Sequence, residues 1–213
     1  MIYAKAILFD FDGTLLDTMS GYSLIAANII NKYHSDYSFK KAKLSYLNTS
    51  GIPFFQQLEI LFPNDKFNFI ISETFEKEKQ KVLFSSKFSN EVKETINYLR
   101  SMNIIIGVSS NNSQEFIDKF IKTGGLEFDI VLGFKKNFEK GKDHFNYILN
   151  KYSLNTQELS FVGDSLKDAE KAINNQIRFI GLCGTFTKEQ FIKNFPQIQT
   201  ISCIEELKKL CVQ

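Results

Sequence analysis

The sequence has little net charge, few cysteines and no long apolar run, and each shortage removes a class of protein. Its 26 basic and 24 acidic side chains leave a formal net charge of +2, which gives no reason to expect a nucleic-acid or membrane partner. No apolar run is long enough to span a bilayer. The three cysteines, Cys183, Cys203 and Cys211, have no CxxC spacing, so neither a disulfide framework nor a zinc site is indicated.

The amino-terminal residues do not have the pattern of a signal peptide, because residues 1–5 lead directly into a strand-like segment. Thiols that stay reduced fit the same interpretation, so we expect a cytoplasmic protein. The 213 residues, of which 43% are hydrophobic and 23% charged, suffice for one globular domain, or for one domain with a smaller insertion.

Short apolar runs alternate with helical patterns along most of the chain. The runs at 5–9, 103–108, 128–132, 159–162 and 178–182 are typical of buried strands. Helical patterns separate or follow them at 90–101, 113–123, 142–152, 165–174 and 204–210. Continuous apolar strands separated by helices predict the α/β class, with a Rossmann-like parallel sheet and helices on both faces.

One gap interrupts this alternation, between the first strand and the second. Residues 16–86 are rich in helical pattern, notably at 18–33, 54–62 and 67–83, and poor in strand pattern. We predict a helical cap domain at 16–86, inserted into a catalytic core of residues 1–15 and 87–213. We expect the cap over the carboxyl ends of the strands, where open α/β sheets bind their ligands.

Two pairs of acidic residues follow predicted strands. Asp10 and Asp12 flank the end of the first strand, and residues two apart on an extended chain point the same way. Asp164 and Asp168 follow the fourth strand in the same manner. Four acids at one sheet edge would repel one another without a cation, and carboxylate oxygens suit Mg²⁺. The alternatives are a solvated turn at Asp10–Gly13 and a helix N-cap at Asp164 or Ser165.

Two further segments offer groups that could bind phosphate. Ser109 and Ser110 end the second strand ahead of a helix, where hydroxyls and free backbone N–H groups can contact an anion. Serines are also ordinary turn and cap residues. Lys140 and Lys142 flank Gly141 before the fourth strand, and either could neutralise phosphate charge or lie on a solvated surface.

Taken together, these residues resemble the motifs of the haloacid dehalogenase-like hydrolases. Asp10–Thr14 matches the first motif, Asp-x-Asp-Gly-Thr, and its continuation through Thr18 is typical of phosphoglycolate-phosphatase-like members. Ser109 matches the second motif, Lys140 or Lys142 the third, and Gly163–Asp168 the fourth, Gly-Asp-x-x-x-Asp. Many members with this type of cap have Lys-Pro at the third motif; Lys-Gly, as found here, favours Lys140.

The resemblance implies a Mg²⁺-dependent phosphatase that forms an aspartyl-phosphate. Asp10 would be the nucleophile, and Asp12 would act as general acid and then as general base. Mg²⁺ would be held by Asp10, Asp164, Asp168 and the backbone carbonyl of Asp12. The phosphoryl group would contact the motif lysine and a set of small residues: Ser109, Ser110, Gly13 and Thr14.

Other functions share this scaffold. A phosphosugar mutase would use Asp12 to return a proton to a bound bisphosphate. A non-catalytic phosphate-binding regulatory module would lack a motif acid, and none is missing. Dehalogenases generally lack the second aspartate, and no lysine near Ser50-Gly51 suggests a phosphonatase. We expect a small phosphorylated metabolite as the partner and a monomer or small homo-oligomer.

Overall fold

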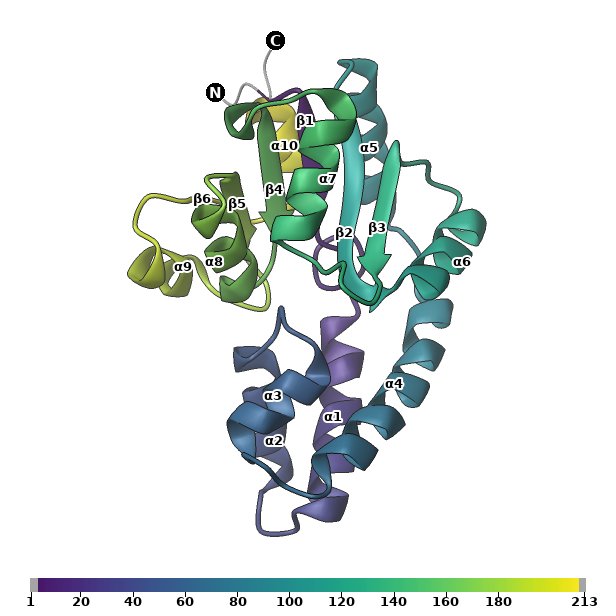
Figure 1. Cartoon of the computed structure of the whole chain (residues 1–213), viewed down its shortest axis with the longest axis vertical. Coiled ribbons are helices and arrows are strands. Elements are labelled where there is room, and N and C mark those ends of the chain that lie inside the picture. Colours follow the sequence, from purple (N-terminus) through teal and green to yellow (C-terminus); the bar gives the residue numbers. More distant parts are fainter. Residues whose placement is uncertain (1–3, 211–213) are drawn as a thin grey trace. The chain divides into compact units, whose positions relative to one another are not determined.

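The computed structural model describes residues 4–210 and divides the chain into two compact units. The sheet unit comprises Met1–Leu16 and Lys87–Gln213, and the helical unit comprises Asp17–Ser86. Figure 1 shows the sheet and its helices in one unit and a cluster of helices in the other. The helical unit is therefore an insertion directly after the first strand.

The sheet unit is built on six parallel strands in the order β3-β2-β1-β4-β5-β6. All four residues of β1 are fully buried, which requires cover on both faces and explains why this strand is a continuous apolar run. The strands are β1 (Ala6–Phe9), β2 (Ile105–Ser113), β3 (Ile130–Phe134), β4 (Leu159–Gly163), β5 (Arg178–Leu182) and β6 (Gln199–Ile201).

Helices supply that cover. Phe145 of α7 and Ala169 of α8 pack with Leu8 and Phe161 in one core cluster, and α5 lies on the opposite side of the sheet (Figure 1). The helices of this unit are α5 (Asn90–Ser101), α6 (Gln114–Gly124), α7 (Lys142–Tyr152), α8 (Leu166–Asn174), α9 (Lys188–Asn194) and α10 (Leu207–Leu210), with short 3-10 turns at Thr156–Glu158 and Ile204–Glu206. The predicted α/β class with a parallel sheet is confirmed.

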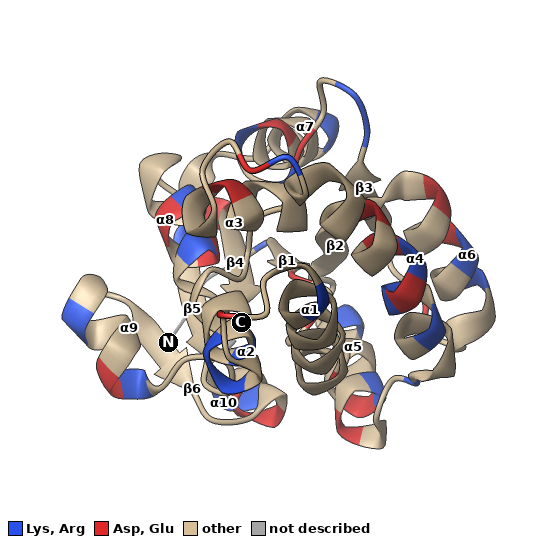
Figure 2. Ribbon diagram, turned by 90° about the horizontal axis from the view of Figure 1, so that it is seen from below, with Lys and Arg blue, Asp and Glu red and all other residues tan. Residues whose placement is uncertain are grey.

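The helical unit has a core of its own. Phe75 is 2% exposed and contacts the rings of Tyr22, Tyr46 and Phe54. Figure 2 shows acidic and basic residues interleaved along α4, where Lys79 pairs with Glu76 at 2.7 Å. The helices of this unit are α1 (Met19–Tyr33), α2 (Phe39–Asn48), α3 (Phe54–Leu61) and α4 (Asn68–Ser85).

The structure differs from the predicted elements in several places. β2 continues to Ser113, five residues past its predicted end, with a register shift against β3 between Ser109 and Ser113. The helices α2 and α9 and the strand β6 were not predicted from the sequence. Cys183 and Cys203 are free thiols, whereas Cys211 lies outside the described residues. No helix within residues 4–210 is long and apolar enough to cross a membrane.

Candidate active site

Three neighbouring strands bring the motif residues to one edge of the sheet. β1 pairs with β2 on one side and with β4 on the other. Asp10 follows β1, Ser109 lies in β2, and Asp164 follows β4. The chain leaves β1 towards β2 and β3 and later returns to β4 on the opposite side. This reversal is a topological switch point, the usual location of a ligand crevice in such sheets.

The turn after β1 is fixed by its backbone and by a buried ring. Gly13 has φ 80°, a conformation that side chains disfavour. Phe11 is fully buried and packs edge-on against Phe120, with ring centroids 5.3 Å apart. The backbone N–H of Asp10 donates to the carbonyl of Val162 in the adjacent strand at 2.8 Å. These contacts explain why a glycine and an aromatic residue accompany the two acids.

The turn after β4 is equally constrained. Ser165 caps α8, accepting from the backbone N–H of Asp168 at 3.1 Å and donating to Asp168 Oδ2 at 2.6 Å. A Cβ atom at Gly163 would lie 2.9 Å from the Cβ of Asp168. The glycine of the Gly-Asp-x-x-x-Asp pattern is thus needed for Asp168 to fold back onto the strand end.

Three carboxylates and one ammonium group form a buried cluster at this edge. One carboxylate oxygen from each of Asp10, Asp164 and Asp168 lies within 4.8 Å of the other two. Lys140 Nζ lies 2.7 Å from Asp10 Oδ1 and 2.6 Å from Asp168 Oδ1. The Lys140 side chain is 1% exposed. Lys140 therefore neutralises part of the negative charge but not all of it.

Burial and the excess of negative charge in this cluster shift the pKa values of its members. Burial raises the pKa of Asp10 well above its ordinary value, and Asp168 and Asp164 add to this while Lys140 opposes it. Burial, with Asp168 beside it, raises the pKa of Asp164 to about 7. Burial alone would lower the pKa of Lys140, but the carboxylates of Asp10 and Asp168 raise it above its usual range. A further cation would stabilise the ionised carboxylates.

The donor set fits a hard divalent cation. All three side chains offer carboxylate oxygens, the ligands that Mg²⁺ prefers, and the described residues contain no His or Cys in the cluster. The residues present are thus suited to a metal site of the magnesium type.

The two candidate lysines lie in different environments. Lys140 is buried in the cluster, whereas Lys142, in the first turn of α7, is exposed. Gly141 between them has φ 115° and ψ −126°, which turns the chain sharply. Only Lys140 is brought to the acidic residues.

Asp12 is placed beside the end of β2. Asn112 Nδ2 donates to Asp12 Oδ2 at 2.7 Å and to Ser110 Oγ at 3.2 Å. The backbone N–H of Asn112 also donates to Ser110 Oγ at 3.1 Å. Ser110 and Asn112 are both buried, so this small network holds the Asp12 carboxylate at the sheet edge.

Ser109 is fully buried, and its hydroxyl lies 2.8 Å from Nδ1 of His144. Burial, followed by the positive charge of Lys140, lowers the pKa of His144 to about 4. Thr14 is 6% exposed, and its hydroxyl has no hydrogen-bond partner among the described residues. Such a buried hydroxyl is suited to a polar ligand.

The chain matches the haloacid dehalogenase-like hydrolase family over residues 7–182. This match covers most of the chain and includes every element of the acidic cluster. The chain belongs to this family. No curated protein sequence matches it significantly.

Solved structures with the same fold match nearly the whole chain. A protein from Lactobacillus delbrueckii subsp. bulgaricus, thought to be a phosphoglycolate phosphatase, superposes with a TM-score of 0.83 at 17% identity, covering 99% of this chain and 98% of that one. A predicted phosphatase from Clostridium acetobutylicum gives 0.78 at 21%, covering 99% and 98%. CbbY from Rhodobacter sphaeroides, in complex with phosphate, gives 0.74 at 17%, covering 97% and 96%. These likenesses show a common fold.

Four residues that form hydrogen bonds to the predicted site residues were not themselves predicted as site residues: Asn112, His144, Ser165 and Thr185. Thr185 follows β5 and donates from Oγ1 to Asp164 Oδ2. A search for polar residues just beyond every strand end would have found Thr185. His144 gave no signal, because a single histidine in a helix is usually structural.

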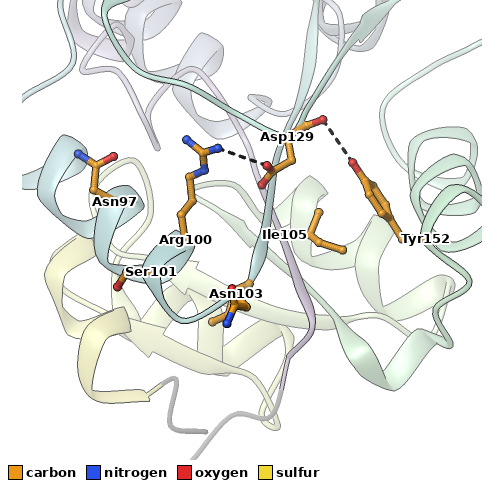
Figure 3. Close-up of a pocket in the computed structure, with 8 residues that line it drawn as sticks. Asn97, Arg100, Ser101, Asn103, Ile105, Asp129 and Tyr152 are labelled. Atoms are coloured by element: carbon orange, nitrogen blue, oxygen red, sulfur yellow. Dashed lines mark hydrogen bonds and ion pairs between the residues drawn. The ribbon is translucent and has the colours of Figure 1, made fainter.

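A cavity lies at the ends of the strands opposite the acidic cluster. Figure 3 shows Arg100 beside Asp129 and, on the far side, the hydroxyl of Tyr152 donating to the Asp129 carbonyl. This cavity of about 670 Å³ is also lined by Ile105, the first residue of β2. Arg100 already pairs with Glu127 and Asp129. The cavity contains none of the motif residues of the family.

Proposed function

We propose that this protein hydrolyses the phosphate monoester of a small metabolite through an aspartyl-phosphate on Asp10. The observation that carries the proposal is the buried cluster of Asp10, Asp164, Asp168 and Lys140 at the end of the central strand. Phosphoryl transfer depends mainly on positioning and charge neutralisation, and this cluster supplies both. Membership of a hydrolase family supports the same reaction class.

Asp10 is the nucleophile of this proposal. Its carboxylate oxygen attacks phosphorus, forming an O–P bond, while the bond from phosphorus to the ester oxygen breaks. Lys140, held between Asp10 and Asp168, favours the ionised form of the nucleophile and offsets charge on the transferring phosphoryl group. Bound Mg²⁺, held by Asp10, Asp164, Asp168 and the Asp12 backbone carbonyl, would offset the remaining negative charge.

Asp12 moves the proton in both halves of the reaction. Protonated Asp12 gives its proton to the leaving alkoxide, and the ionised carboxylate then takes a proton from the water that attacks phosphorus. That second attack releases inorganic phosphate and restores the Asp10 carboxylate. The hydrogen bond from Asn112 at 2.7 Å supports this role because it holds the carboxylate in one orientation.

Contacts to the phosphoryl oxygens are assigned to the hydroxyls of Ser109 and Thr14 and to polar groups of Ser110 and Gly13. The buried hydroxyl of Thr14, which has no hydrogen-bond partner within residues 4–210, supports this assignment. The CbbY structure, which was solved with phosphate, supports a phosphorylated ligand. The likeness to proteins thought or predicted to be phosphoglycolate phosphatases makes a small phosphorylated acid the first substrate to test.

The helical unit is proposed to act as the cap that selects the substrate. Its position in the sequence supports this, because Asp17–Ser86 are inserted directly after the Asp10–Thr14 turn. The chain thus joins this unit directly to the turn that carries the nucleophile.

The decisive experiment compares Asp10→Asn with the wild-type protein on an aryl phosphate in the presence of Mg²⁺. We expect the substitution to lower kcat by a thousandfold or more, on the order seen when nucleophiles are removed. Asp118→Asn, which changes an exposed acid on α6, should retain wild-type activity. Full activity in Asp10→Asn would refute the nucleophile assignment. An isomerised sugar phosphate without free phosphate would instead indicate a mutase.

A further inference from the structure

His144 contacts the serine that the proposed function assigns to phosphate binding. His144 is in the first turn of α7, four residues after Lys140. Its Nδ1 atom lies 2.8 Å from Ser109 Oγ, and both residues are completely buried. The histidine ring also packs against Phe138, with centroids 4.7 Å apart. The imidazole is therefore held in place on one side and directed at the serine hydroxyl.

The ring is neutral under ordinary conditions, because burial and the charge of Lys140 lower the pKa of His144 to about 4. A neutral imidazole carries one proton, on Nδ1 or on Nε2. The position of this proton determines what Ser109 can do.

A serine hydroxyl has one proton to donate and two lone pairs that accept. If His144 donates from Nδ1, Ser109 accepts that hydrogen bond and its own proton is available to a phosphoryl oxygen. If Nδ1 is bare, the serine proton goes to the ring and is lost to the ligand. Only the first arrangement makes Ser109 a phosphate donor.

We propose that His144 is a positioning residue that donates from Nδ1 to Ser109 and so directs the serine hydroxyl proton at the bound phosphoryl group. This rests on the proposed function, which makes Ser109 a phosphate ligand. His144 does not contact the substrate in this arrangement. Its hydrogen bond fixes the rotation of the Ser109 hydroxyl, which could otherwise point its proton in several directions.

The test is a double-substitution cycle that measures binding of inorganic phosphate in the presence of Mg²⁺ by calorimetry. His144→Leu, which preserves volume but removes the hydrogen bond, should weaken phosphate binding about tenfold. His144→Asn, which can place an amide near Nδ1, should weaken it by less than about threefold. In a Ser109→Ala background, adding His144→Leu should change affinity by less than about twofold.

An equal loss from His144→Leu with and without Ser109 would overturn the proposal, because the effect would then be structural. Ser160→Ala is the matched control for the serine, since Ser160 is buried in β4 and its hydroxyl has no partner among the described residues. It should leave phosphate affinity unchanged.

The tautomer can be read without substituting His144. The chain has only two histidines, His34 and His144, so ¹⁵N chemical shifts of the two rings are readily assigned. We expect the phosphate-bound protein to carry the His144 proton on Nδ1; a proton on Nε2 would overturn the proposal even if His144→Leu fails to fold. If the wild-type protein binds phosphate but hydrolyses no ester, the proposed function is refuted. The substitution cycle then still decides whether His144 positions Ser109. Absence of phosphate binding would refute both.

Discussion

At the scale of single residues, the position of Lys140 decides between two candidates that the sequence could not separate. Lys140 and Lys142 differ little in sequence context, but Gly141, at φ 115°, turns one side chain into the acidic cluster and leaves the other exposed. From the sequence, Lys140 was favoured only by its resemblance to the family motif. The physical reason lies in the backbone at Gly141, which no residue pattern reports.

Replacing each lysine by methionine should therefore have different effects. Lys140→Met leaves Asp10 and Asp168 without their counterion and should lower the free energy of unfolding by about 3–5 kcal/mol without Mg²⁺. It should also lower kcat strongly. Lys142→Met changes an exposed side chain and should stay within about 0.5 kcal/mol of wild type. Urea denaturation and aryl phosphate assays check both, and equal effects would contradict the assignment of Lys140 to the site.

The acids of the cluster were predictable because each directly follows a strand with a strong apolar pattern. Their partners were not. Asn112 reaches Asp12 across 100 positions of sequence, and His144 reaches Ser109 across 35. Such contacts depend on the order of the strands in the sheet and on the side of the sheet to which each side chain points. Neither can be predicted from the residues next to each position.

At the scale of elements, long helices and fully buried strands were predicted well, whereas short or mostly exposed elements were not. The long helix α4 and the strands β1, β4 and β5 were identified with bounds close to the observed ones. The helix α2 was missed because only Ala42 and Tyr46 of its ten residues are buried. The three-residue strand β6 buries only Ile201, which is too little for a strand pattern. The end of β2 was misjudged because its Ser-Asn run is typical of turns.

The cap of α8 is an element-scale feature that also serves the site. Ser165→Ala should cost about 1 kcal/mol of stability as a lost N-cap, and it should also reduce kcat because Asp168 loses the hydrogen bond at 2.6 Å. Ser89→Ala provides the matched control, since Ser89 caps α5 by accepting from Val92 N–H at 3.2 Å. Thermal melting should show similar losses for both variants. Only Ser165→Ala should lose activity; a similar loss in Ser89→Ala would mean that the activity effect reflects stability alone.

At the scale of the whole molecule, the two units have separate apolar cores, and the acidic cluster belongs to the sheet unit alone. Burying three carboxylates opposes folding when they are ionised. The folded-state pKa of about 7 for Asp164 lies above its ordinary value. The protonated Asp164 side chain therefore adds to the stability of the folded protein in acid. That contribution is lost as the pH rises through 7.

Mg²⁺ should therefore stabilise the protein more in alkaline than in acidic solution. At a concentration a hundred times its dissociation constant, Mg²⁺ should raise Tm by roughly 5 to 10 °C at pH 8, and by less at pH 6, where Asp164 holds its proton. Scanning calorimetry with Mg²⁺ or with a chelator checks this. Asp164→Asn should show little response to Mg²⁺ at either pH, and an equal response at both values in the wild type would exclude a site whose carboxylates must first ionise.

The positive φ at Gly141 also limits which residues this position can hold. Proline fixes φ near −65°, whereas Gly141 has φ 115°, and a Cβ atom at this position would lie 3.3 Å from Cδ of Lys171. A single mutation from glycine to proline would force this turn to rebuild while the lysine before it is held by two carboxylates. Gly141→Pro should therefore displace Lys140 from Asp10 and Asp168 unless neighbouring residues change with it.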